Sequence, residues 1–141
     1  MFIKKLIFIS LILFLTPIFL RAQDTFDLKI NVTNIDKLEG VLRVCLGNKK
    51  EDFLKNCFQS QEVEVTQKEM IVVFKNVPKG NYVVNIYHDE DNNGKLNRNG
   101  IFRSPSEDYG FSNNPRSFFG PPKFNKCLFE INSHLEISIA F

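Results

Sequence analysis

The sequence predicts an all-β fold: a single antiparallel β-sandwich of about seven short strands, with one long ordered loop. Three observations support this prediction. Apolar and polar residues alternate with the period of two that is typical of half-buried strands, turn residues separate the alternating stretches, and no stretch shows a convincing helical period. A closed barrel is the alternative that this pattern leaves open.

The clearest strand has four apolar residues that alternate with polar ones: Phe26, Leu28, Ile30 and Val32. Six further strands are predicted at 42–46, 63–65, 70–77, 82–88, 127–131 and 135–141. Turn residues separate them, as in Pro78-Lys79-Gly80. The stretch Lys49 to Asn56 has room for one helical turn only. Short strands without a long helix favour two packed sheets, as in immunoglobulin-like or transthyretin-like domains.

The segment from Gly100 to Phe124 shows neither the strand nor the helix period, and it contains four prolines. It also carries six aromatic residues: Phe102, Tyr109, Phe111, Phe118, Phe119 and Phe124. Structureless connections of this length are uncommon in compact domains unless they are functional or pinned. Because so many rings would be a liability in a disordered loop, we expect this segment to pack over one end of the sandwich.

Residues 1–22 have the features of a secretory signal peptide, since Lys4 and Lys5 precede an apolar run from Leu6 to Leu20 and the small residue Ala22 precedes the expected cleavage site. A membrane anchor is the alternative, but the run is shorter than the roughly 20 residues that a spanning helix needs. We therefore expect a secreted or periplasmic protein whose mature domain, residues 23–141, has no membrane span. Without the signal the chain has 15 basic and 16 acidic residues, which gives no reason to expect nucleic acid as a partner.

The cysteines of the chain are arranged as expected for an exported protein. Cys45 and Cys57 flank a short polar connection, and we expect them to form a disulfide in an oxidising compartment. Cys127 lies in an apolar, strand-like run, where a buried free thiol is the expected state. The spacing of the three cysteines does not match a zinc site.

Oxygen-bearing residues recur at alternate positions directly after the strand at 82–88, in the pattern that opens a calcium loop. Gly94 allows the sharp turn within that loop. The predicted ligands are side chains of Asp89, Asp91, Asn93 and Asn97, together with the backbone carbonyl of Lys95.

The loop does not belong to a helix-loop-helix calcium site, because its twelfth position is Gly100 and a strand precedes it. We expect Glu107 or Asp108 to fold back and supply the missing ligand, with water as the other candidate. The similarity of this loop to a calcium loop favours calcium over magnesium, which demands stricter octahedral geometry. Because the loop has few carboxylates, we expect a Kd for calcium of ~10⁻⁴–10⁻³ M. The alternative is a hydrated turn whose acidic side chains accept backbone N–H groups.

Four stretches of the chain resemble one known family: Phe74 to Tyr82, His88 to Leu96, Glu107 to Asn114 and Phe119 to Pro122. Together they are similar to the DUF2141 family of exported bacterial proteins of unknown function, over nearly the whole mature chain. The resemblance implies a single small β domain in the bacterial envelope or outside the cell, and no established reaction. The turn at 74–82 is also similar to turns in transthyretin-like and carboxypeptidase-regulatory-like sandwiches.

These observations leave two classes of function. We favour a non-catalytic module that binds an envelope or extracellular protein or glycan through its loop face, with five ligand-binding candidates: His88, Tyr109, Phe111, Asn113 and Asn114. The alternative is a metal-assisted hydrolase that uses His88, Asp89 and Glu107 around a metal-bound water. Consecutive strand residues point to opposite faces, so His88 and Asp89 are not expected to form a catalytic pair.

Overall fold

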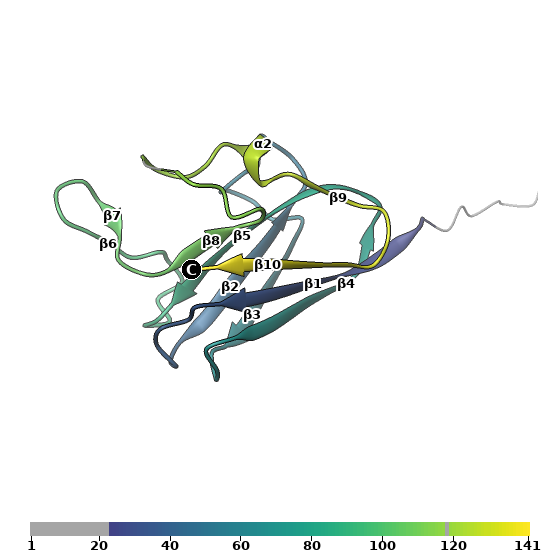
Figure 1. The fold of residues 1–141 in the computed structure, drawn as a ribbon. Helices are drawn as coiled ribbons and strands as arrows, with labels where there is room; N and C mark the ends of the chain where they lie inside the picture. Colours follow the sequence, from purple (N-terminus) through teal and green to yellow (C-terminus); the bar gives the residue numbers. More distant parts are fainter. Residues whose placement is uncertain (1–22, 118) are drawn as a thin grey trace, which may run out of the picture.

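The computed structural model describes residues 23–117 and 119–141, and the chain it describes is nearly all-β (Figure 1). The signal peptide predicted at 1–22 lies outside the described residues. The elements in chain order are β1 (Thr25–Thr33), β2 (Val41–Gly47), β3 (Gln59–Glu64), β4 (Met70–Pro78), β5 (Gly80–Asp89), β6 (Arg98–Asn99), β7 (Ser104–Pro105), β8 (Tyr109–Phe111), α2 (Phe124–Cys127), β9 (Phe129–Ile131) and β10 (Leu135–Ala140).

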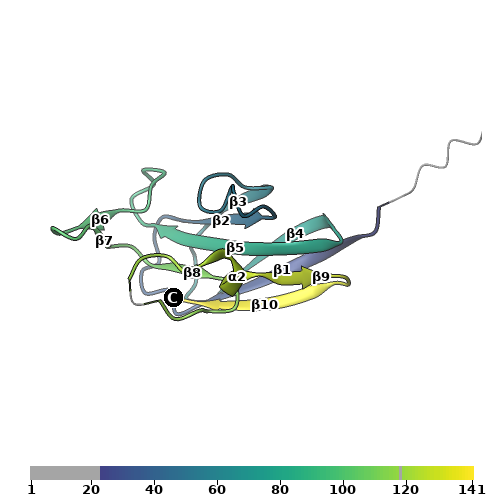
Figure 2. The ribbon, with the colours of Figure 1, turned by 90° about the horizontal axis from the view of Figure 1, so that it is seen from above.

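These strands form three sheets. One has the order β10-β1-β4, and a larger one has the order β3-β2-β5-β8, with β9 also paired to β5. The third is the small hairpin β6–β7, which extends away from the rest of the chain at the left of Figures 1 and 2. The strand β5 is therefore central, because it pairs with β2, β8 and β9.

The two larger sheets share one hydrophobic core. The alternation predicted for the first strand is present in β1, where Leu28, Ile30 and Val32 are fully buried. The same period holds along β5, which contributes Tyr82, Val84 and Ile86 to that core. Val83, between Tyr82 and Val84, is buried in a second cluster, and the last two residues of β5, His88 and Asp89, are both fully buried.

The predicted single antiparallel sandwich of seven strands is reproduced only in part. All seven predicted strand regions contain strand, but the described chain has ten strands, and β1 pairs with β10 in parallel. The predicted strand at 127–131 begins as the helical turn α2 and becomes β9 only at Phe129. Because β9 pairs with β5 and β10 pairs with β1, the turn at 132–134 connects two sheets instead of closing a hairpin.

The long segment at 100–124 contains more structure than its sequence pattern predicted. Tyr109–Phe111 pairs with β5 as β8, and Ser104–Pro105 pairs with β6. The expectation that its rings pack over one end is wrong for Phe102 and Phe119, whose side chains are 93% and 97% exposed. It holds for Phe111, which is buried in a second small cluster with Val83 and Cys127.

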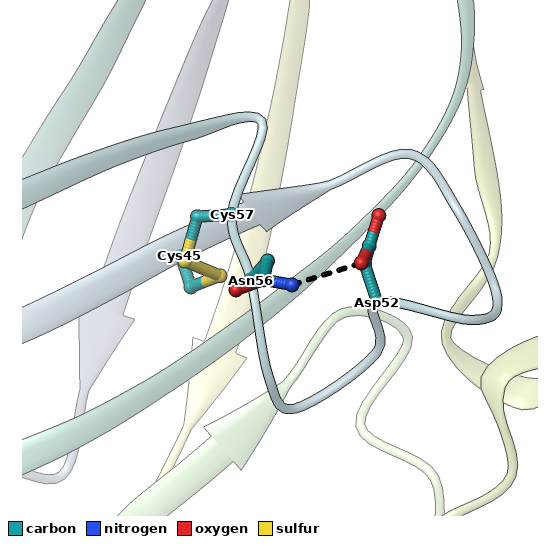
Figure 3. Close-up of a disulfide and its surroundings, with 4 residues drawn as sticks. All are labelled: Cys45, Asp52, Asn56 and Cys57. Atoms are coloured by element: carbon teal, nitrogen blue, oxygen red, sulfur yellow. Dashed lines mark hydrogen bonds between the residues drawn. A yellow bond between two sulfur atoms is a disulfide. The ribbon is translucent and has the colours of Figure 1, made fainter.

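The predicted disulfide between Cys45 and Cys57 is present, with the two Cα atoms 5.4 Å apart (Figure 3). It joins β2 to the end of the connection that precedes β3, and Asn56 Nδ2 donates to Asp52 Oδ1 within that connection at 2.9 Å. Cys127 is free and buried, as predicted, and burial raises the pKa of its thiol to about 11. Among the described residues, no helix is both long enough and apolar enough to cross a membrane.

Candidate metal centre

The acidic loop begins where β5 ends. Asp89 is the last residue of β5, and the chain continues from it toward the hairpin β6–β7. Two residues of the loop take positive φ angles, Asn92 at 57° and Gly94 at 79°, which confirms the predicted sharp turn at Gly94. The strand fixes Asp89, and the turn brings the following residues back toward it.

Asp89 is the anchor of the loop and is fully buried. Its Oδ1 accepts the backbone N–H of Asn93 at 3.0 Å, and its Oδ2 accepts the N–H of Gly94 at 2.9 Å. Oδ2 also accepts Nε of Arg43, at 2.5 Å, from the neighbouring strand β2. Burial alone would raise the pKa of Asp89, but the bonds from Arg43, Gly94 and Asn93 together hold it below the ordinary value. The carboxylate is therefore charged at neutral pH.

Asp91, Asn93 and Asn97 form a network of side chains above Asp89. Asp91 Oδ2 accepts Nδ2 of Asn93 at 2.9 Å and Nδ2 of Asn97 at 3.0 Å. Asn97 Oδ1 accepts Nδ2 of Asn93 at 2.8 Å, and Asn93 Oδ1 accepts the backbone N–H of Lys95 at 2.8 Å. The side-chain oxygens that were predicted as ligands are thus gathered at one place.

Glu107 completes this group from a distant part of the chain. Its Oε1 accepts the backbone N–H of Glu90 at 3.0 Å, and its Oε2 accepts the backbone N–H of Asn97 at 2.8 Å. One carboxylate oxygen from each of Asp89, Asp91 and Glu107 lies within 4.8 Å of the other two. This acidic triad has the spacing to hold a metal ion.

Asp108 takes a different position from its neighbour Glu107 and is not a member of the triad. Burial, followed by the nearby charges of Asp36 and Glu90, raises its pKa above the ordinary value. Its backbone carbonyl accepts the N–H of His88 at 2.9 Å. Of the two residues that the sequence left open, Glu107 is the one beside Asp89 and Asp91.

Comparison with protein families shows which family the chain belongs to. The model of a family described as an uncharacterized protein conserved in bacteria, DUF2141, matches residues 30–138. The chain belongs to the DUF2141 family. No curated protein and no solved structure gives a significant match to this DUF2141 chain.

The predicted ligand-binding residues of this DUF2141 chain take on different roles. His88 is fully buried, with Nε2 2.6 Å from the backbone oxygen of Glu39, and Phe111 is only 8% exposed. Asn113 Nδ2 donates to the carbonyls of Lys126 and Leu128, and the Asn114 amide bonds to the backbone of β10 at Ser138 and Ala140. Tyr109 alone of the five combines an exposed side chain, at 40%, with no side-chain hydrogen bond among the described residues.

The hydrolase alternative receives no support from this geometry. A general base must come within hydrogen-bond reach of a substrate. The His88 ring is sealed from solvent and its Nε2 is already bonded, while Asp89 is paired with Arg43. The hydrogen bond of His88 to the Glu39 backbone is a structural contact.

Sequence reasoning did not find Arg43, which neutralises Asp89. Arg43 is a polar residue between buried Leu42 and Val44, so its position in a strand was visible from the alternation. The signal that would connect it to the site is the strand register, in which Arg43 lies opposite Tyr87 and Val41 opposite Asp89. This register is a tertiary property of the DUF2141 fold and is not visible in a single sequence.

Proposed function

We propose that residues 23–141 form an exported, non-catalytic β-sandwich module that binds calcium through the acidic loop and Glu107. The observation that carries this proposal is the burial of Glu107. Its side chain is only 6% exposed, and it forms none of the ion pairs among the described residues. A buried carboxylate without a counter-charge is costly, and a cation shared with Asp89 and Asp91 would remove that cost.

The hydrogen bonds leave oxygen lone pairs free for such an ion. Asp89 Oδ1 and Glu107 Oε2 each accept one hydrogen bond among the described residues, although a carboxylate oxygen can accept about two. Asp91 Oδ1 likewise accepts only a long bond from the N–H of Asn93, at 3.3 Å. Each of the three carboxylates can therefore give one ligand, and Asp89 keeps its bond to Arg43 through the other oxygen.

The remaining ligands would come from amides. The NH2 group of Asn97 donates to both Asp91 Oδ2 and Glu107 Oε1, at 3.0 and 3.4 Å, so it lies between two carboxylates. A cation would take over that bridging role, and rotation of the amide would then present its oxygen. Oxygens from Asn93 and Asn97 and the Lys95 carbonyl would raise the set to six, the lower limit for calcium.

The proposed location is outside the cytoplasm. The disulfide between Cys45 and Cys57 fits an oxidising compartment, and the predicted signal peptide would direct the chain there. The proposed partner is an envelope or extracellular protein or glycan, bound on the loop face that carries the exposed ring of Tyr109. Aromatic side chains at such a surface can pack on an apolar face of a ligand while polar neighbours bond its edges.

Calcium titration with thermal melting tests the proposal. The protein is purified from the periplasm after expression of the full chain, and its melting temperature is measured from EDTA to 10 mM calcium. A site with a Kd of ~10⁻⁴ M would be stabilised by about 2.7 kcal/mol at 100-fold excess of calcium. We expect a rise of several degrees with calcium and a smaller one with the same concentration of magnesium.

Asp91→Asn is the matched variant for this experiment. Asp91 is exposed, and its side chain forms hydrogen bonds only with Asn93 and Asn97 among the described residues. The variant should fold with nearly unchanged stability in EDTA but lose most of the calcium-dependent shift. An unchanged melting temperature of the parent protein at 10 mM calcium, or equal shifts for parent and variant, would show that the loop is a plain turn.

A further inference from the structure

A cavity of about 560 Å³ opens beside the proposed calcium site. Residues of β5 and β8 and of the hairpin β6–β7 line it, together with Ser117 and Pro121. Cavities of this size are typical of small-ligand sites. None of the proposed calcium ligands lines it, so it is a separate site.

Two tyrosines form the floor of this cavity. Tyr87 of β5 and Tyr109 of β8 are directly opposite each other in the antiparallel register, which places both side chains on the same face of the sheet. Both line the cavity, and Asn85, two residues before Tyr87 on β5, adds an amide group beside them. Adjacent aromatic rings with nearby polar groups suit a ligand that has a flat apolar face and a hydroxylated edge, such as a sugar ring.

The charged side chains that line the cavity are all positive. Arg98 and Arg103 of the hairpin line it, and the described residues place no acidic side chain in its wall. Neither arginine belongs to any of the ion pairs found among residues 23–117 and 119–141. Arg98 Nη1 donates to the backbone oxygen of Arg103 at 3.2 Å, so the two residues are neighbours. Guanidinium groups bind carboxylates in a planar, two-pronged geometry.

We propose that this cavity binds an acidic saccharide, with the sugar ring on Tyr87 and Tyr109 and its carboxylate against Arg98 and Arg103. The proposal rests on the proposed function in one respect, since it names the ligand class for the loop face. It differs from that function in its residues, because carboxylate recognition here uses arginines and not calcium. A neutral sugar would leave the two cationic groups unpaired and should bind more weakly.

Titration calorimetry with defined oligosaccharides tests this inference. The protein, purified from the periplasm after expression of the full chain, is titrated with hyaluronan hexasaccharide, oligogalacturonate and, as the neutral probe, maltohexaose. EDTA is present because calcium itself bridges uronate chains. We expect saturable binding of at least one carboxylated probe and at least tenfold weaker binding of maltohexaose.

Three variants assign the binding to the cavity. The double variant Arg98→Gln/Arg103→Gln should weaken binding of the acidic probe at least tenfold, because each guanidinium contributes a charge-assisted contact. Tyr109→Ala should weaken it several-fold and Tyr109→Phe should restore it, since the ring and not the hydroxyl does the stacking. Arg116→Gln is the charge-matched control, because Arg116 is exposed, lies on the same long segment and does not line the cavity. It should change the Kd by less than twofold.

The outcomes separate this inference from the calcium proposal. Calcium-dependent melting without binding of any carboxylated probe would overturn the saccharide inference alone. Saturable acidic binding in EDTA without a calcium shift would support the inference while the calcium proposal fails. Equal affinity for maltohexaose, or an unchanged Kd in the double arginine variant, would each overturn the saccharide site.

Discussion

Replacing Asp89 with asparagine is expected to destabilise the fold even without calcium. The new side chain would be the same size, but its NH2 group cannot accept hydrogen bonds. If its oxygen keeps the bond from Asn93, the NH2 group faces two donors, Nε of Arg43 and the N–H of Gly94. The variant therefore loses two bonds to a charged acceptor in a fully buried position, and it leaves the Arg43 charge without that partner.

The size of this effect follows from those losses. Each buried donor without a partner costs about 1–3 kcal/mol, and breaking one side of a buried ion pair costs about 3–5 kcal/mol. Because Arg43 is partly exposed and also pairs with Glu62, we take the lower half of the range, about 3–4 kcal/mol. For a domain of this size the melting temperature should fall by roughly 10–20 °C.

Urea denaturation in EDTA, followed by circular dichroism, measures the loss directly. Asp91→Asn is the control, because it removes the same charge just beyond the buried end of β5, where the side chain is exposed. It should cost less than about 1 kcal/mol. If the two variants lose equal stability, Asp89 is not the buried anchor of the loop, and the geometry from which the site was built is wrong.

Three further predictions use the same assay, and a fourth concerns a glycine. Folding lowers the pKa of Asp89 from its ordinary value of 3.8. The stabilisation of the fold by this carboxylate is therefore complete above that value and is lost as the pH falls through the lower folded pKa. The free energy of unfolding of Asp89→Asn should accordingly depend less on pH between 7 and 2 than that of the parent. Burial raises the pKa of Asp108, so its charge opposes folding at neutral pH and Asp108→Asn should raise stability at pH 7; a loss there would contradict this sign. Replacing Cys45 and Cys57 with serine should cost about 3 kcal/mol, since the bridge spans a sequence separation of 12, and a loss below about 1 kcal/mol would show that it restricts the unfolded chain little. Gly110→Ala should cost about 1–3 kcal/mol, because the new Cβ would lie 2.5 Å from Ile139 Cγ2, and an unchanged stability would show that the sheets can separate there.

The long strands could be predicted because their local pattern and their burial agree. In β1 and β5 every second residue faces the shared core, so the period of two is visible in the sequence. The strand β8 was missed because it has three residues, too few for a period, and its centre is Gly110. Only a glycine allows the close approach to Ile139, and that contact is visible only in the folded chain.

The parallel pairing of β10 with β1 could not be predicted for a related reason. Strand direction depends on which edge of which sheet the chain reaches, and alternation within a strand carries no information about it. More of the candidate site could be predicted, because most of the residues gathered there lie within one loop from Asp89 to Asn97. What the sequence left open was the choice between Glu107 and Asp108, which depends on the direction in which each side chain leaves the backbone.

The arrangement of Glu107 connects the two proposed sites. Its carboxylate holds the backbone N–H groups of Glu90 and Asn97, and the N–H of Ser106 donates to the carbonyl of Asn97 at 2.9 Å. These hydrogen bonds join the two ends of the β6–β7 hairpin to each other and to the end of β5, next to the acidic triad. Because the same hairpin carries Arg98 and Arg103, a cation on the triad would fix the frame that positions the cavity wall without contacting a ligand in the cavity. Calcium would then act on ligand affinity through rigidity alone, so its effect on the acidic saccharide should be small beside the effect of removing the two arginines.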